Sequence, residues 1–145
     1  FVPFETGIAT GADFIMMSHI SVSKVTESSI PASMSELMMQ TILREELGFE
    51  KVIITDAFDM ASITEYYGAG EAADNAFKAG TDIILMPQDF KEAYETVLSS
   101  VKSGDISRER LDESVTRILA VKIQRGLLST EDNQTQPAAS ADVSE

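Results

Sequence analysis

Three short, mainly apolar runs divide the chain. They are Phe14–Met17, Val52–Thr55 and Ile83–Met86. Each run is continuous rather than alternating with polar residues, which is typical of parallel strands whose two faces are both covered. We therefore predict three parallel strands that are adjacent in the order of the sequence.

Polar caps and glycines mark helices between these runs, because a serine side chain can begin a helix and a glycine can end one. The predicted helices are residues 33–47, opened by a capping box at Ser33–Glu36, residues 71–79 ending at Gly80, residues 90–102 ending at Gly104, and a last helix capped by Ser107. Residues 2–10 are predicted to be the end of another helix. The order β-α-β-α-β-α-α indicates an α/β fold with flanking helices.

The predicted sheet is too small to close a core. A parallel sheet of three strands leaves two edges unpaired, so we expect the chain to be part of a larger barrel. Residues 1–5 carry neither a starting Met nor the basic region of a signal peptide, and we expect the chain to begin inside a longer protein. Residues 129–145 are polar and are predicted to be a disordered tail. Their Asn133-Gln134-Thr135 sequence matches a glycosylation acceptor, a short pattern that chance readily produces.

Charge and composition exclude several classes of function. The chain has 24 Asp and Glu against 11 Lys and Arg, a formal net charge of −13. Such a charge argues against binding nucleic acid or an anionic membrane, and no apolar run approaches the roughly 20 residues of a membrane span. With no Cys and one His, disulfides are impossible and a zinc site is not expected. We expect no metal and no cofactor.

Candidate functional residues follow the predicted strands, because parallel α/β folds carry their chemistry where strands end. His19 comes shortly after the first run, and Asp56 directly after the second. From spacing alone, Asp56 is equally well a catalytic carboxylate or the cap of a following helix. Asp59 is better explained as a residue that suits the start of a helix. A lone histidine such as His19 is more often structural than a ligand-binding residue.

Around the second run, the sequence resembles glycoside hydrolase family 3. A helix ending in Leu47-Gly48-Phe49, an apolar strand and then Thr55-Asp56 resemble the family's nucleophile strand. Further pieces resemble the family in the same order: Met16–His19 its Met-x-x-His strand end, Pro31–Ser33 its Pro-Ala-Ser helix start, Ala79–Pro87 its Ala-Gly-x-Asp strand, and Ile106–Leu119 its terminal barrel helix. The resemblance covers about residues 1–128.

The resemblance implies a fold and an activity. Residues 1–128 would be the C-terminal portion of a (β/α)₈ TIM-type barrel with three of its parallel strands, and Asp56 would be the nucleophile of a retaining glycosidase. His19 and Met60 would contact the carbohydrate substrate. Ala57 follows the nucleophile where the family's β-glucosidases usually have Trp, and the Asp-x-x-x-Met pattern is similar to the β-N-acetylhexosaminidase branch. That branch acts on N-acetylglucosamine residues of peptidoglycan fragments or chitin oligosaccharides.

One departure from the branch bears on activity. Its Lys-His-Phe-Pro-Gly-His-Gly segment and the loop with its His–Asp dyad are not in these 145 residues. The general acid/base and the N-terminal half of the barrel are therefore expected outside the chain, which alone should be inactive. Two alternatives stay open: a non-catalytic sugar-binding or scaffold domain of the same fold, and a phosphate-binding barrel using Gly68-Ala69-Gly70, which lacks the full glycine pattern. The sequence is compatible with a cytoplasmic or a secreted parent.

Overall fold

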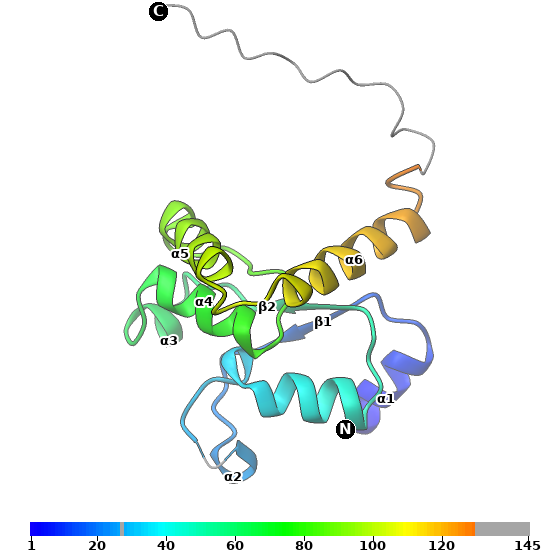
Figure 1. Ribbon diagram of the computed structural model, residues 1–145. Helices are drawn as coiled ribbons and strands as arrows, with labels where there is room; N and C mark the ends of the chain where they lie inside the picture. The colour runs from blue at the N-terminus through cyan, green and yellow to red at the C-terminus, as the bar shows by residue number, and fades with distance from the viewer. Residues whose placement is uncertain (27, 130–145) are drawn as a thin grey trace, which may run out of the picture.

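The computed structural model describes residues 1–26 and 28–129 and has an α/β fold (Figure 1). In chain order its elements are α1 (Val2–Ala9), β1 (Phe14–Met17), α2 (Ser23–Thr26), η1 (Ala32–Met34), η2 (Leu37–Glu46), β2 (Val52–Thr55), α3 (Ala61–Thr64), α4 (Ala69–Ala79), α5 (Phe90–Ser103) and α6 (Arg108–Gln124). The strands lie at the centre, α4 and α5 pack side by side, and α6 contacts β2 and extends away from α5 toward the upper right of the view. Apart from Ser129, the predicted tail lies outside the described residues, as does Asn133.

The first two predicted strands are confirmed. β1 and β2 pair in parallel, with a register that runs from Phe14 opposite Val52 to Met17 opposite Thr55. The pairing extends one residue further, because the backbone N–H of Asp56 donates to the carbonyl of Met17 at 2.9 Å. β2 is covered on both faces, as its continuous apolar sequence predicts.

The prediction of a third regular strand is wrong. Ile83 forms a single parallel bridge with Ile54, on the edge of β2 away from β1, and its carbonyl accepts the N–H of Thr55 at 3.0 Å. The N–H of Leu85 then donates to the Thr55 hydroxyl at 3.0 Å instead of to a backbone carbonyl, and Met86 adopts a left-handed φ of 47°. Residues 83–86 therefore lie beside β2 and parallel to it, as predicted. The Thr55 side chain replaces a backbone acceptor, however, so the backbone hydrogen bonds between the two segments stop there.

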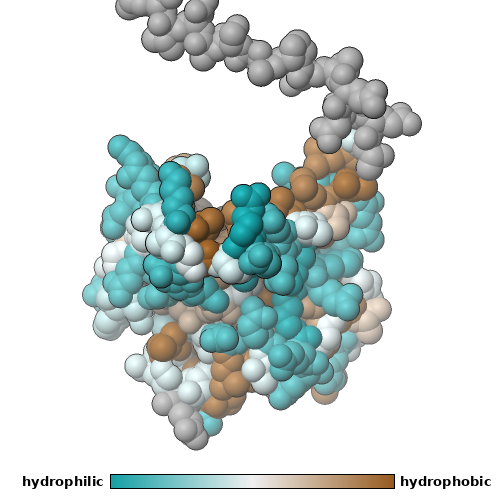
Figure 2. Space-filling model, viewed as in Figure 1, coloured by the Kyte–Doolittle hydropathy of each residue, from teal (hydrophilic) through white to brown (hydrophobic). Residues whose placement is uncertain are grey.

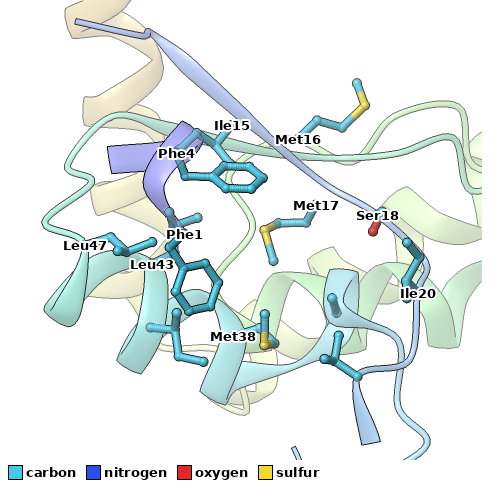
Figure 3. Close-up of a pocket in the computed structure, with 13 residues that line it drawn as sticks. Phe1, Phe4, Ile15, Met16, Met17, Ser18, Ile20, Met38, Leu43 and Leu47 are labelled. Atoms are coloured by element: carbon cyan, nitrogen blue, oxygen red, sulfur yellow. The ribbon is translucent and has the colours of Figure 1, made fainter. Parts of the chain in front are cut away.

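β1 differs from the prediction that both strand faces are covered. Ile15 and Met17 are buried in the core, whereas Phe14 and Met16 are 48% and 52% exposed. In Figure 3, Met17 points toward Met38 of η2 while Met16 points to the opposite side. β1 is the edge of the sheet, and only one of its faces packs against helices of the described chain.

The predicted ends of the later helices are confirmed. Gly80 and Gly104 follow α4 and α5 with φ values of 125° and 88°, which side chains rarely adopt. The Ser107 hydroxyl caps α6 by accepting the N–H of Arg110 at 3.1 Å. These local signals therefore located the C-terminal ends of α4 and α5 and the N-terminal end of α6.

The predicted capping box at Ser33–Glu36 is wrong. Ser33 is fully buried in η1, and its hydroxyl oxygen lies 2.8 Å from Nδ1 of His19. η2 begins only at Leu37 and has the wider π-type hydrogen bonding, and the hydroxyl that serves its start is that of Ser35, which accepts the N–H of Met38 at 3.4 Å. A tertiary partner thus takes the hydroxyl that the sequence pattern assigns to the helix.

A buried carboxylate ties three elements together at the amino ends of the strands. Oδ2 of Asp82 accepts from Nη2 of Arg44 at 2.8 Å and from the N–H of Ile53 at 2.9 Å. Oδ1 accepts from the hydroxyl of Ser114 at 2.6 Å and from Nη1 of Arg117 at 3.1 Å. Asp82 thereby joins η2, β2 and α6 at the strand end that in such folds serves stability.

One face of α6 is apolar and exposed. Val115, Leu119 and Ile123 recur every four residues, which places them on the same side of the helix. Apolar surface also gathers at the C-terminal end of α6 (Figure 2). No element of the described chain covers this stripe. Within residues 1–26 and 28–129, no helix has the length and apolar character that crossing a bilayer requires.

Candidate functional site

Asp56 stands where β2 leaves the sheet. Its N–H is still bonded to the end of β1, and its half-buried carboxylate accepts the N–H of Ala57 through Oδ1 at 2.8 Å. The alternative that Asp56 caps the following helix is wrong, because α3 has Met60 as its N-cap and no side-chain cap. The carboxylate is thus held at a strand terminus without a capping role.

His19 contacts the residue that follows Asp56. Nε2 of its ring lies 2.9 Å from the carbonyl oxygen of Ala57, and Nδ1 lies 2.8 Å from the hydroxyl oxygen of Ser33. A carbonyl can only accept, so Nε2 carries a proton, and in the neutral ring the Ser33 hydroxyl donates to Nδ1. The ring also packs edge-on against Phe58, with centroids 5.1 Å apart. Asp56 and His19 therefore both lie at the carboxyl end of the sheet.

The turn that carries Asp56 is anchored on both sides. His19 binds the carbonyl of Ala57, and the N–H of Phe58 donates to the carbonyl of Leu85 at 2.9 Å. The Phe58 side chain is buried among Met34, Ile63, Ala72 and Ala76. Sequence reasoning missed Phe58, and it gave Ser33 a different role. The turn therefore presents Asp56 from a backbone that tertiary contacts hold in place.

Asp59 and Met60 lie at the rim of this turn. Asp59 is exposed and precedes α3, as predicted, but it does not cap the helix by a hydrogen bond. Met60 instead caps it through its backbone carbonyl, which accepts the N–H groups of Ile63 and Thr64 at 2.9 and 3.0 Å. Met60 is 43% exposed.

A cavity of about 510 Å³ opens beside His19. It lies between the segment that follows β1 and helix α3, both of which leave the sheet at the carboxyl ends of the strands. Its walls are formed by His19, Ser21, Ser29, Pro31, Ala61, Ser62, Glu65, Tyr66 and Tyr67. Most of these side chains carry hydroxyl groups.

A second cavity, of about 190 Å³, is almost entirely apolar (Figure 3). It lies between α1, β1 and η2, where Phe1, Phe4 and Met38 point toward Met17. Only Ser18 contributes a polar side chain to its lining. Such a lining suits the packing of further apolar groups rather than the binding of a sugar.

The phosphate-loop alternative loses its support. Gly70 lies within α4, where a Cβ atom would stand 2.3 Å from Oγ1 of Thr96 on α5. The glycine therefore permits close packing of two helices rather than the approach of a phosphate. In the part of the chain that the structure describes, no three His, Asp or Glu side chains converge as a metal site would require.

Comparisons with known proteins agree on one family. A protein of Cellulomonas fimi named beta-N-acetylglucosaminidase/beta-glucosidase is 29% identical over 135 residues, with 87% of this chain and 24% of that protein covered. Beta-hexosaminidase A of Pseudoalteromonas piscicida is 30% identical over 141 residues, with 83% and 24% covered. The chain thus spans about a quarter of the length of these relatives.

A solved structure and a family model extend the agreement. The glycoside hydrolase family 3 beta-N-acetylglucosaminidase from Paenibacillus sp. str. FPU-7 superposes with a TM-score of 0.83 at 37% identity, covering 97% of this chain and 26% of that one. The model of the glycosyl hydrolase family 3 N terminal domain matches residues 1–121. On the matched sequence and the shared fold together, the chain belongs to glycosyl hydrolase family 3.

Proposed function

We propose that the protein containing this chain is a retaining β-N-acetylhexosaminidase that removes terminal N-acetylglucosamine residues through a glycosyl-enzyme on Asp56. The observation that carries the proposal is the carboxylate of Asp56, held at the carboxyl end of β2 by a turn that is anchored on both sides. The names of the related hexosaminidases support the choice of sugar.

The carboxylate of Asp56 suits nucleophilic attack. In the retaining mechanism it forms a bond to the anomeric carbon while the bond to the leaving oxygen breaks, and a second group protonates that oxygen. Water, deprotonated by the same second group, then releases the sugar. Oδ1 of Asp56 is bonded to a backbone N–H, whereas Oδ2 has no hydrogen-bond partner among residues 1–26 and 28–129. Oδ2 is therefore the atom that we propose attacks.

His19 does not supply the second group. Both of its ring nitrogens are already hydrogen-bonded within the chain, so a proton on either is not available for transfer to a leaving oxygen. We propose that His19 and Met60 contact the carbohydrate substrate instead, His19 through the ring that forms part of the cavity wall and Met60 through its exposed side chain. The general acid/base then comes from polypeptide outside this chain.

We further propose that residues 1–128 form part of a (β/α)₈ barrel that other polypeptide completes. The unpaired edge of β1, its half-exposed Phe14 and Met16, and the apolar stripe on α6 support this arrangement. A completed barrel would pair the open edge and cover these side chains. The 145-residue chain alone should then cleave no aryl N-acetylglucosaminide.

Trapping the glycosyl-enzyme tests the assignment of Asp56. The full-length protein is treated with a fluorinated N-acetylglucosamine donor that forms the intermediate faster than it breaks down, and is then digested and analysed by mass spectrometry. We expect the label on the peptide spanning Val52–Met60, localised to Asp56. Asp59→Ala serves as the control and should be labelled normally. A label on Asp59 or outside this peptide would refute the assignment, and binding without any label would favour the non-catalytic alternative.

A further inference from the structure

We propose that the cavity beside His19 binds the leaving-group side of the substrate, and that it takes a neutral sugar rather than an acidic one. The inference rests on the proposed function of Asp56. The cavity measures about 510 Å³, within the range of roughly 300–1,000 Å³ typical of small-molecule sites. It opens at the carboxyl ends of β1 and β2, the same end of the sheet as Asp56.

A single side chain joins the cavity to the nucleophile turn. The ring of His19 forms part of the cavity wall and also binds the carbonyl of Ala57. The opposite wall is α3, which begins directly after the turn that carries Asp56. Asp56 is not itself a lining residue, and we place the leaving-group sugar in the cavity because His19 and α3 connect it to the turn that carries Asp56.

The lining has the chemistry of a carbohydrate site. The hydroxyls of Ser62, Tyr66 and Tyr67 have no hydrogen-bond partner in the described part of the chain, and Tyr66 is 73% exposed. The Ser21 hydroxyl donates to the carbonyl of Ser29 at 2.6 Å and retains its capacity to accept. A tyrosine offers a flat apolar face and a polar tip, which match the C–H face and hydroxyl rim of a sugar ring.

Charge decides which sugar the cavity favours. Among the described residues that line the cavity, Glu65 is the one with a charged side chain, and neither Lys nor Arg is present. A carboxylate without a cation beside it repels an anionic ligand. A chitin oligosaccharide is neutral, whereas the stem peptide of a peptidoglycan fragment carries free carboxylates. The lining therefore favours the chitin oligosaccharide.

Binding to an inactive protein tests the inference without relying on turnover. In the full-length protein carrying Asp56→Asn, calorimetry measures the affinities for N-acetylglucosamine and for its β-1,4-linked disaccharide. Adding Tyr66→Ala should weaken binding of the disaccharide by up to about tenfold, the range of a lost aromatic contact, and leave the monosaccharide unaffected. Tyr94→Ala is the matched control, because Tyr94 is 59% exposed on α5 and away from this cavity; it should change neither affinity.

A second variant tests the charge argument. Glu65→Gln should strengthen binding of a peptidoglycan disaccharide with an acidic stem peptide and leave the neutral disaccharide unchanged. Equal losses for monosaccharide and disaccharide in Tyr66→Ala, or a preference for the acidic ligand in the presence of Glu65, would overturn the inference. If Tyr66→Ala weakens disaccharide binding but no label forms on Asp56, the catalytic role of Asp56 is refuted and the leaving-group site is kept. If the label forms and Tyr66→Ala has no effect, the leaving-group site is refuted and the catalytic role is kept.

Discussion

Nε2 of His19 lies 2.9 Å from the carbonyl oxygen of Ala57, the residue that follows Asp56. This hydrogen bond connects the end of β1 to the turn after β2 by a side chain, beyond the last backbone bond of the sheet. Its effect is to fix the peptide on which the Asp56 carboxylate is mounted. His19 is thereby a positioning residue for the proposed nucleophile.

Two substitutions of His19 distinguish the effect of its hydrogen bond to Ala57 from that of its hydrogen bond to Ser33. His19→Gln keeps an N–H donor near the position of Nε2, whereas His19→Asn keeps a polar atom only near Nδ1 and loses the bond to Ala57. We expect His19→Asn to lower kcat of the full-length protein by up to about a hundredfold, the effect of misplacing a reacting group, with a smaller change in KM. His19→Gln should retain more activity.

The protonation of the His19 ring offers a direct check of this bond. In a long-range ¹H–¹⁵N correlation spectrum of the full-length protein, the signals of His19 are those lost in His19→Gln, and they should show the proton on Nε2 in the neutral ring. A proton on Nδ1 instead, or equal activity losses in His19→Asn and His19→Gln, would argue against the positioning role.

Asp82→Ala should destabilise the fold strongly. Burial lowers the pKa of Arg44, and the charge of Asp82 opposes this shift, so removing Asp82 leaves a mostly buried guanidinium unpaired. Breaking one partner of a buried ion pair typically costs about 3–5 kcal/mol. Urea unfolding of the full-length protein measures the loss. Glu95→Ala is the control: its pair with Lys91 is exposed and should contribute less than about 1 kcal/mol. A comparable loss in both variants would contradict the prediction.

Asp13 should make stability depend on pH in the acid range. Hydrogen bonds from Arg125 and then Lys51 lower the pKa of Asp13 below its ordinary 3.8. The folded state thus favours the carboxylate, and this contribution is present above pH 3.8 and lost as the pH falls through the lower folded value. Unfolding midpoints measured from neutral to acid pH should fall less steeply in Asp13→Asn. Arg125→Gln should change the slope in the same direction, and parallel curves for all three proteins would refute the assignment.

Gly70→Ala should destabilise the packing of α4 on α5. Alanine normally favours a helix over glycine, but the added Cβ would stand 2.3 Å from Oγ1 of Thr96. Overpacking of this kind costs about 1–3 kcal/mol. Gly7→Ala is the matched control, since Gly7 also lies within a helix, α1, and an added Cβ would meet nothing within 4 Å. Thermal unfolding of the double variant Gly70→Ala/Thr96→Ala should show that shortening Thr96 restores part of the stability lost in Gly70→Ala. A more stable Gly70→Ala protein would show that the helices separate without penalty.

The sequence by itself determined the features that depend on near neighbours. The apolar runs located β1 and β2, and Gly80, Gly104 and Ser107 located the ends of the later helices, because backbone conformation and capping are decided within a few residues. The position of Asp56 directly after an apolar strand likewise placed a carboxylate at the carboxyl end of the sheet.

Only the tertiary structure decided which partner each polar group has. The Ser33 hydroxyl pairs with His19 rather than a helix, the Thr55 hydroxyl takes the N–H that would have continued a third strand, and Asp82 collects guanidinium groups from two distant helices. A buried polar group needs a hydrogen-bond partner, and the sequence contains several groups that could serve equally well. The choice among them is made by packing between residues far apart in sequence, which no local pattern records.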